Sequence, residues 1–275
     1  MITSTILKKI TIFAEKNMQM SFSVITINYN NSLGLKQTIE SVTCQTNKDF
    51  EFIIIDGGST DGSVDVIKEY ENQITYWVSE KDYGIYNAMN KGIVKAHGNY
   101  SIFMNSGDIF YDNNVLEKIA AINRDPDIIV GKVSKDNSDT IISPPPNGNF
   151  TMYHLYSGAN PHQGSFIRTA LLQKYPYDEN LKISADWKFF VQTLFLENCS
   201  IYYTNEHIAK YDTSGISSSN PQLMRKEKEE YLKTIFPPRV LADYRKMKDS
   251  ECLTQSLTPL LRKNYKIDHI LSTIN

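Results

Sequence analysis

The sequence predicts an α/β fold, with a Rossmann-like, mostly parallel sheet and helices on both of its faces. Short apolar, β-prone runs alternate with segments of helical periodicity between residues 22 and 131, which is typical of a doubly wound parallel sheet. The run Phe50–Ile55 is apolar nearly throughout, as expected for a strand that is covered on both faces.

The composition sets the class of protein. The 275 residues are 41% hydrophobic and 22% charged, with a formal net charge of −2. This length suits one large α/β domain or two small ones. The near-neutral charge argues against a broad basic surface, so we expect no nucleic-acid partner.

Charge is unevenly distributed along the chain. Residues 221–275 hold 11 Lys and Arg against 7 Asp and Glu, and Pro237-Pro238 interrupts their helical pattern once. A basic tail can contact anionic lipid, but charged runs more often form a helical face that stays in solvent. Both interpretations stay open for this C-terminal helical extension.

The cysteines and the start of the chain bear on location. The three cysteines form no CxxC pair, which disfavours a zinc site or a disulfide scaffold and suits a reducing, cytoplasmic compartment. No stretch is apolar enough for a transmembrane helix. Residues 1–20 lack the pattern of a signal peptide, and we expect an amphipathic helix or a poorly ordered extension there.

The first half of the chain alternates regularly between strands and helices. Ser32 is expected to cap the first helix and Asp61 the second, because both side chains accept hydrogen bonds from a helix start. Further helices are expected at Ile85–Ala96 and Asn113–Asn123. The expected strands are Phe22–Ile27, Phe50–Ile55, Ile74–Ser79, Tyr100–Met104 and Asp127–Gly131.

This regular pattern changes after residue 132, which we take as a boundary between a half at 21–131 and a half at 132–220. Loops are expected at Lys135–Asp139 and Ser143–Gly148, where three prolines exclude regular structure. A polar loop, Asn160–Phe166, leads into a short strand. The remaining elements are a helix at Ser184–Leu196, strands at Ile201–Tyr203 and from His207, and the loop Asp212–Gly215.

Polar loops follow four strands of the first half. Because parallel strands end at the same edge of a sheet, these loops should lie close together. A tyrosine ring, hydrogen-bonding groups, adjacent glycines and carboxylates there would suit a nucleotide with a divalent cation on its phosphates. Two acids near these loops also have a purely structural explanation: Asp61, which follows the second loop, is a helix cap, and Asp82 is a turn residue. The four loops are Asn28-Tyr29-Asn30, Asp56-Gly57-Gly58, the segment at Asp82, and Asn105-Ser106-Gly107-Asp108.

Two common ways of binding a nucleotide are absent from the sequence. The first strand is followed by Asn28–Ser32, without the G-x-G-x-x-G of a dinucleotide-binding fold. No G-x-x-x-x-G-K-[ST] loop occurs either. A nucleotide held by a metal and carboxylates, rather than by a glycine loop, points to nucleotide-sugar chemistry.

The ordered motifs resemble the start of glycosyltransferase family 2, with the GT-A fold. They are Ser23–Asn30, Ile53–Gly62, Gly84–Gly92, Ala96–Tyr100 and the tip Asn105–Asp108. The likeness is close over residues 22–110 and looser from 132 to 216, where it depends on Pro161-His162-Gln163 and Ser184–Trp187. The pattern is most similar to bacterial capsule, exopolysaccharide and lipopolysaccharide glycosyltransferases, including the colanic-acid-like branch.

The resemblance implies a donor site at the first set of loops. Asn28 and Tyr29 would border the base, Asp56 would hydrogen-bond it, and Asp82 would complete the base and ribose pocket. Gly57 replaces a second acid that the family often has. Asn105 replaces the first acid of the family's metal motif, which leaves Asp108 as the ligand of Mg²⁺ or Mn²⁺. The implied donor-binding residues are Asn28, Tyr29, Asp56, Gly57, Asp82, Asn90 and Asn105.

The resemblance also implies a catalytic base and an acceptor site. Asp186 matches the base, and the resemblance favours this role over the alternative of an acid in the first turn of a helix that the helix dipole stabilises. His162 and Gln163 would line the acceptor or sugar site together with Trp187, whereas an isolated histidine is more often structural.

The function implied is inverting, metal-dependent transfer of a sugar, most often from a UDP-sugar, to a glycan or lipid-linked glycan in bacterial surface polysaccharide biosynthesis. The enzyme would work in the cytoplasm, with peripheral contact at the inner membrane face. An alternative is a catalytically decayed nucleotide- or glycan-binding module, because Asn105 and Gly107 stand where acids are expected. A nucleotidyltransferase of similar fold would need a glycine-rich first loop, which is missing.

Overall fold

The computed structural model describes residues 20–135, 141–142, 150–158, 161–212 and 220–264, with side chains described as far as residue 254. Several expectations lie outside these residues: the N-terminal extension before residue 20, the loops at 136–139 and 143–148, and the loop that follows Asp212.

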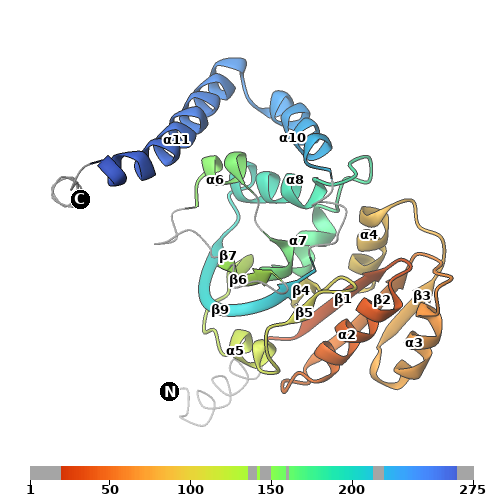
Figure 1. Ribbon diagram of the computed structural model, residues 1–275. Helices are drawn as coiled ribbons and strands as arrows, with labels where there is room; N and C mark the ends of the chain where they lie inside the picture. The colour runs from red at the N-terminus through yellow and green to blue at the C-terminus, as the bar shows by residue number, and fades with distance from the viewer. Residues whose placement is uncertain (1–19, 136–140, 143–149, 159–160, 213–219, 265–275) are drawn as a thin grey trace, which may run out of the picture.

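One mixed, mostly parallel sheet forms the centre of the molecule (Figure 1). Its strand order is β3-β2-β1-β4-β8-β6-β9-β5, and β7 pairs with β6. The pairs β1–β2, β1–β4, β2–β3 and β6–β9 are parallel, whereas β8 is antiparallel to both of its neighbours. The strands are β1 (Phe22–Asn28), β2 (Phe50–Asp56), β3 (Tyr76–Ser79), β4 (Tyr100–Phe103), β5 (Ile109–Phe110), β6 (Ile128–Lys135), β7 (Ile141–Ile142), β8 (Ser165–Arg168) and β9 (Ile201–Tyr211).

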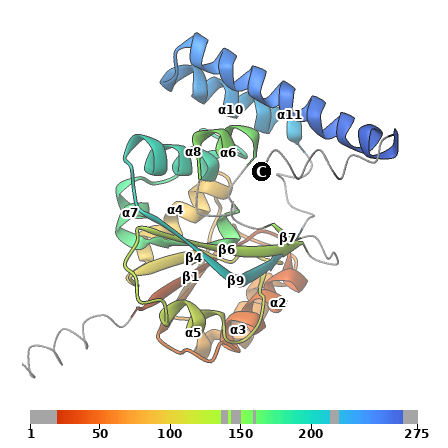
Figure 2. The same cartoon turned by 90° about the vertical axis from the view of Figure 1, so that its left-hand side faces the viewer.

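Helices cover both faces of this sheet, as predicted (Figures 1 and 2). Successive side chains of a strand point to opposite faces, so Phe52 and Ile54 of β2 join one core while Ile53 and Ile55 join the other. The first core packs under α2 (Ser32–Thr43), α3 (Ser63–Glu69) and α5 (Val115–Ala120). The second packs under α4 (Ile85–Lys95), α6 (Met152–Ser157), α7 (Thr169–Lys174) and α8 (Ala185–Val191).

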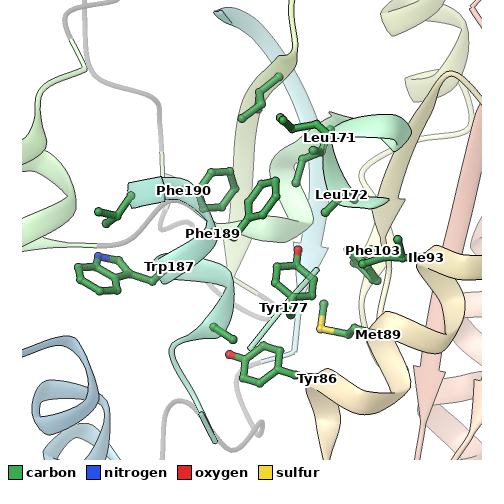
Figure 3. Close-up of a cluster of buried hydrophobic side chains, with 14 of the residues drawn as sticks. Tyr86, Met89, Ile93, Phe103, Leu171, Leu172, Tyr177, Trp187, Phe189 and Phe190 are labelled. Atoms are coloured by element: carbon green, nitrogen blue, oxygen red, sulfur yellow. The ribbon is translucent and has the colours of Figure 1, made fainter. Parts of the chain in front are cut away.

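Aromatic rings fill the second core where it approaches the carboxyl end of β4 (Figure 3). The Tyr177 ring lies 5.7 Å from the rings of Tyr86, Phe103 and Phe189. Buried aromatic rings pack closely against one another, so they move little. They therefore support α4 and α8, whose side chains pack against them.

Two expected helix caps are wrong. The first helix begins after Asn31, whose side chain accepts a hydrogen bond from the N–H of Gly34 at 3.1 Å. Gly62 is the N-cap of α3, where φ of +94° favours glycine. The Asp61 carboxylate instead accepts from the N–H groups of Ser32 and Ser63, so it joins the starts of α2 and α3.

Several element boundaries also differ from the prediction. Strand β6 is longer than expected and reaches Lys135, and the two expected strands after residue 200 are one continuous strand, β9. Helix α8 ends at Val191 and continues as a π-helical turn, η4 (Gln192–Leu196). Tertiary pairing explains the longer strands, because β6 and β9 support each other over Ile128–Lys135.

The C-terminal residues form two helices, α10 (Pro221–Ile235) and α11 (Pro238–Asn264), separated at the predicted Pro237-Pro238 break. In both views they lie beyond α6 and α8, on the side opposite α2 and α3 (Figures 1 and 2). Leu232 and Leu241 belong to the second core. The C-terminal helices therefore share a core with the half of the protein that contains α8.

Candidate active site

The four predicted polar loops meet at the carboxyl edge of the parallel strands. Asn28 pairs with Asp56 across β1 and β2, and Asp56 pairs with Ser79 across β2 and β3. The backbone of the Asn105–Asp108 turn is tied to β1, because the N–H of Ser106 donates to the carbonyl of Ile27. One edge of one sheet therefore presents all four loops.

The Asp56 carboxylate connects the ends of β1, β2 and β3 by hydrogen bonds. Its carboxylate is fully buried and accepts hydrogen bonds from Asn28 Nδ2 at 2.7 Å, from Ser79 Oγ at 2.6 Å, and from both the backbone and the hydroxyl of Ser59. Burial alone would raise the pKa of Asp56, but the bonds from Ser59 and Ser79 hold it below its ordinary value. A nucleobase would therefore have to displace one of these four hydrogen bonds to reach Asp56.

Asn28, Tyr29 and Gly57 form a surface at the end of β1 and β2. The Oδ1 atom of Asn28 is buried without a hydrogen-bond partner, whereas the side chain of Tyr29 is 69% exposed. A Cβ on Gly57 would lie 3.0 Å from an Asp82 carboxylate oxygen and 3.1 Å from the Tyr29 ring. Asp82 itself is paired with Lys91 at 2.6 Å. A larger residue at position 57 would therefore have to displace the side chain of Tyr29 or Asp82 slightly.

The Asn105–Asp108 turn is held by a threonine that the sequence did not single out. The hydroxyl of Thr38, on α2, donates to the Asp108 carbonyl at 2.7 Å and accepts from the N–H of Gly107 at 3.0 Å. Gly107 adopts a φ of +103°, and the Asp212 side chain lies directly beside it. Only the tertiary fold brings Thr38 and Asp212 to this turn.

Asp108 is buried and has no ion pair to a lysine or arginine among the described residues. Its side chain accepts a hydrogen bond from the N–H of Asp212 at 2.9 Å, and the side chain of Gln163 also bonds to it. Burial raises the pKa of Asp108 from 3.8 to about 6, a rise that the nearby charge of His162 only partly opposes. Asp108 is therefore a buried carboxylate for which the nearby charge of His162 only partly offsets the effect of burial.

Asp186 lies in the first turn of α8 and is surrounded differently. One carboxylate oxygen lies 3.2 Å from His162 Nδ1, and the other accepts from the Tyr86 hydroxyl at 3.1 Å. Burial acts to raise the pKa of Asp186, but the hydrogen bond and charge of His162 outweigh it, so the pKa is lowered. Burial of the ring acts to lower the pKa of His162, but the hydrogen bond and charge of Asp186 raise it above its ordinary value.

His162 connects the two halves of the site. Its second ring nitrogen, Nε2, lies 3.2 Å from Asn105 Nδ2. Asn105, His162, Asp186 and Tyr86 thus form a continuous chain of side chains, called the His162 bridge below. His162 and Gln163, expected at the acceptor or sugar site, lie between Asp186 and Asp108. Sequence reasoning missed Tyr86, because it occupies an apolar helix face and reads as a core residue.

Trp187, which was expected to line the acceptor or sugar site, is buried. The side chain is 2% exposed and its indole N–H donates to the Leu155 carbonyl at 2.8 Å. Lys228 of α10 lies over the ring at 5.0 Å, and Tyr231 meets it edge-on. Trp187 therefore anchors α8 against α6 and α10 instead of facing solvent.

Asn90, expected to bind the donor, has its amide engaged within the protein. It accepts from the N–H of Tyr177 and donates to the carbonyl of Tyr177 and to Glu179. These bonds join α4 to the segment before α8. A shallow hollow beside them is lined by Tyr83, Tyr86, Asn87, Glu179 and Lys182 among others, and Tyr86 places it next to Asp186.

No group of three or more His, Cys, Asp or Glu side chains is placed to hold a metal ion within the described residues. Asp108 and the neighbouring Asp212 are the acids at the turn where a metal was expected. None of the helices in the described parts of the chain has both the length and the apolar character that a membrane span requires.

Comparison with known proteins gives a consistent family. Residues 23–180 match the family described as Glycosyl transferase family 2. An uncharacterized glycosyltransferase of Mycobacterium tuberculosis is 33% identical over 205 residues, which are 71% of this chain and 76% of that protein. A glycosyltransferase of Mycobacterium bovis, named for PGL/p-HBAD biosynthesis, is 28% identical over 204 residues, or 70% of this chain and 77% of the other.

A solved structure shares the fold. The structure of Staphylococcus aureus TarS (residues 1–349) in complex with UDP-GlcNAc superposes with a TM-score of 0.62 at 22% identity. The match covers 73% of this chain and 61% of the TarS chain, so this chain spans less than two thirds of that structure. The likeness supports the GT-A type of fold that was predicted from the sequence.

Proposed function

Since the chain belongs to glycosyltransferase family 2, we propose that it transfers a sugar, with inversion, from a nucleotide-diphosphate sugar to an acceptor hydroxyl. The observation that carries this proposal is the His162 bridge. It holds an ionised carboxylate, Asp186, at the same end of the sheet as the donor-side loops and the Asp108 turn.

Asp186 is the proposed catalytic base. In a single displacement, the acceptor oxygen forms a bond to the anomeric carbon while the bond from that carbon to the diphosphate oxygen breaks. The nucleoside diphosphate leaves with the bonding electron pair, and the acceptor proton passes to Asp186. The lowered pKa keeps Asp186 ionised at neutral pH. Contacts with Tyr86 and His162 fix the orientation of its two carboxylate oxygens.

UDP is the proposed nucleotide of the donor. Asn28 offers a buried, unpartnered acceptor oxygen, and a uracil ring carries an imide N–H that could donate to it. Tyr29, the next residue, presents an exposed ring for stacking, and Gly57 lies beside both this ring and the Asp82 carboxylate. The complex of TarS with UDP-GlcNAc supports this choice of nucleotide.

A divalent cation, Mg²⁺ or Mn²⁺, fits the Asp108 turn. A buried carboxylate for which the nearby charge of His162 only partly offsets burial favours an added cation, and hard cations take oxygen ligands from carboxylates, phosphates and water. Asp108 would hold the ion, with the Asp212 carboxylate as the adjacent oxygen source. Bound there, the cation would neutralise charge that develops on the departing diphosphate.

The proposed acceptor is a glycan or a lipid-linked glycan of bacterial surface polysaccharide biosynthesis. The hollow beside Tyr86 includes Asn87, Glu179 and Lys182 in its lining and lies next to Asp186 through the Tyr86 hydroxyl, which places hydrogen-bonding groups for an acceptor sugar close to the proposed base. The relative named for PGL/p-HBAD biosynthesis supports an acceptor of a glycoconjugate pathway. We place the enzyme at the cytoplasmic face of the membrane, with the basic C-terminal helices as the peripheral contact.

A second candidate function is a binding module with a decayed active site. Asn105 occupies the position of an acid, and its Nδ2 atom lies 3.2 Å from His162 Nε2. Such a module would bind a nucleotide without a cation and would not turn over any donor.

The test is a screen of nucleotide-sugars for hydrolysis and transfer, with Asp186→Ala and Asp186→Asn compared with wild type. Removal of a general base should lower kcat by about 100-fold to 10,000-fold, while UDP binding by calorimetry stays within about twofold because Asp186 lies outside the donor pocket. Full turnover by both variants would rule out Asp186 as the base. Metal-independent UDP binding with no turnover by wild type would favour the binding module.

A further inference from the structure

Helix α10 contains one buried acidic residue. Only Glu227 and Leu232 are buried in this helix, and Glu227 is 8% exposed, whereas Glu229 and Glu230 on the same helix are exposed. Burying a carboxylate costs free energy unless hydrogen bonds or a cation compensate it. The partners of Glu227 therefore indicate what the residue does.

Those partners are three successive backbone N–H groups. Glu227 Oε1 accepts from Lys182 at 2.7 Å, and Oε2 accepts from Ile183 at 3.1 Å and from Ser184 at 3.0 Å. Hydrogen bonds to an ionised acceptor are stronger than neutral ones. Three consecutive donors that converge on one carboxylate fix the path of this peptide in a single conformation, which we call the Glu227 clamp.

The Glu227 clamp ends two residues before Asp186. Ser184 is the N-cap residue of α8 and Asp186 lies in the first turn of that helix, so the position of the clamped peptide sets the position of the carboxylate. Further contacts tie the same two helices together. The Ser184 hydroxyl donates to the Met224 carbonyl, and Lys228 lies over the Trp187 ring.

Asp186 is thus fixed from two directions. His162 and Tyr86 hold its carboxylate oxygens, while Glu227 on α10 holds the backbone of residues 182–184, which leads into the first turn of α8. Proton transfer requires the base within hydrogen-bond reach of the acceptor hydroxyl, and a misplacement of about 1 Å can cost about 100-fold in rate. A residue that fixes the backbone of the base can therefore control kcat without contacting the substrate.

We propose that Glu227 is a positioning residue for sugar transfer, and that α10 is in this way part of the catalytic apparatus. This inference rests on the proposed role of Asp186 as base. The donor-side loops, residues 28–30, 56–58 and 105–108, have no hydrogen bond to Glu227. Loss of the clamp should therefore lower kcat and leave donor binding intact.

The experiment compares Glu227→Ala and Glu227→Gln with Glu230→Gln, an exposed glutamate of the same helix. Glu227→Ala should lower kcat per UDP-binding site by about 10-fold to 100-fold, with the KM for donor and the Kd for UDP within about twofold. Glu227→Gln keeps one carbonyl acceptor and should lie between Glu227→Ala and wild type. Glu230→Gln should match wild type.

Two readouts separate this role from simple stabilisation. If Glu227 only stabilised the fold, its loss would lower Tm and the number of UDP-binding sites, but kcat per binding site would stay at the wild-type value. That result would overturn the proposal. Amide hydrogen exchange provides a readout independent of turnover: the N–H groups of residues 182–184 should lose protection in Glu227→Ala and keep it in Glu230→Gln.

The failure of this inference differs from failure of the proposed function. If Asp186→Ala retains full activity, the base assignment fails, whatever Glu227 does. If Asp186 is essential but Glu227→Ala turns over at the wild-type rate per site, or if its 182–184 amides stay protected, the clamp does not position the base.

Discussion

Asp108 and Asp186 are both carboxylates affected by burial at the same end of the sheet, yet their pKa values shift in opposite directions. Burial raises the pKa of Asp108 to about 6, and the nearby His162 charge only weakens this effect. Asp186 experiences burial as well, but a direct hydrogen bond from His162 lowers its pKa. The difference lies in the partner, because His162 contacts Asp186 directly.

Two carboxylates with opposite shifts are suited to different tasks. An acid that is costly to ionise gains most from an added cation, as expected for a metal ligand on the donor side. An acid that is ionised and already oriented by donors can receive a proton on the acceptor side. His162 and Gln163, which are adjacent in sequence, contact Asp186 and Asp108 respectively, so one short segment couples the two sites.

The largest expected effect comes from Asp108→Asn. The native pKa of Asp108 is raised, so the native state binds more protons than the unfolded state between pH 3.8 and about 6. Ionisation therefore removes stability as pH rises through this window, by up to about 3 kcal/mol. Asn avoids that loss. Without divalent metal at neutral pH, the variant should unfold at higher urea concentration than wild type, while transfer falls by about 100-fold or more.

Asp112→Asn is the matched control. A hydrogen bond and ion pair with Lys118 lower the pKa of Asp112, so its removal should reduce stability at neutral pH instead of increasing it. Mn²⁺ should stabilise wild type and Asp112→Asn but not Asp108→Asn. An Asp108→Asn variant that is less stable than wild type in EDTA at neutral pH would contradict the comparison of the two carboxylates.

The meeting of the first-half loops at one sheet edge was predictable from sequence because its signals are local. Apolar runs that lead into Asn28, Asp56 and Asn105 indicate the edge of a sheet, and β2 and β4 both pair in parallel with β1. The general position of Asp186 and His162 came from the family resemblance. Their direct contact was not predictable, because 24 residues separate them and no periodicity encodes the distance.

The misses have a common physical cause. Tyr86 reads as core because its ring is buried, and the hydroxyl that reaches Asp186 leaves no trace in the hydrophobic pattern. Trp187 was assigned to a sugar, but α10 covers it. Glu227 is one of several charged residues in a polar helix, and only the tertiary structure distinguishes it from Glu229 and Glu230. Sequence patterns report burial, whereas these roles depend on partners distant in the chain.

A smaller effect is expected from His162→Gln, which removes the charge beside Asp186. The hydrogen bond and charge of His162 lower the pKa of Asp186, so the pKa should rise and the acid limb of the kcat profile should move to higher pH, with a loss of about 10-fold to 100-fold at neutral pH. The measurement is the pH dependence of kcat for both proteins. An unchanged acid limb would show that His162 does not set the ionisation of Asp186.

The same variant makes a prediction for stability. The raised pKa of His162 stabilises the native state fully below 6.5, and this contribution is lost as pH rises through the native pKa. The lowered pKa of Asp186 stabilises above 3.8 and is lost as pH falls through its native value. His162→Gln should therefore cost about 1–3 kcal/mol near pH 6, and less at alkaline pH. A cost that is equal at both pH values would contradict the ion pair.

The smallest effect is expected from Tyr86→Phe. The ring stays packed against Tyr177, but Asp186 loses the hydroxyl that donates at 3.1 Å. A typical hydrogen bond contributes about 0.5–1.5 kcal/mol net, so kcat should fall by about 3-fold to 10-fold while UDP binding is unchanged. Tyr177→Phe is the control, since the buried Tyr177 hydroxyl has no partner and its removal should leave kcat unchanged and stability equal or higher. If both variants reduce kcat equally, ring packing rather than the Tyr86 hydroxyl supports Asp186.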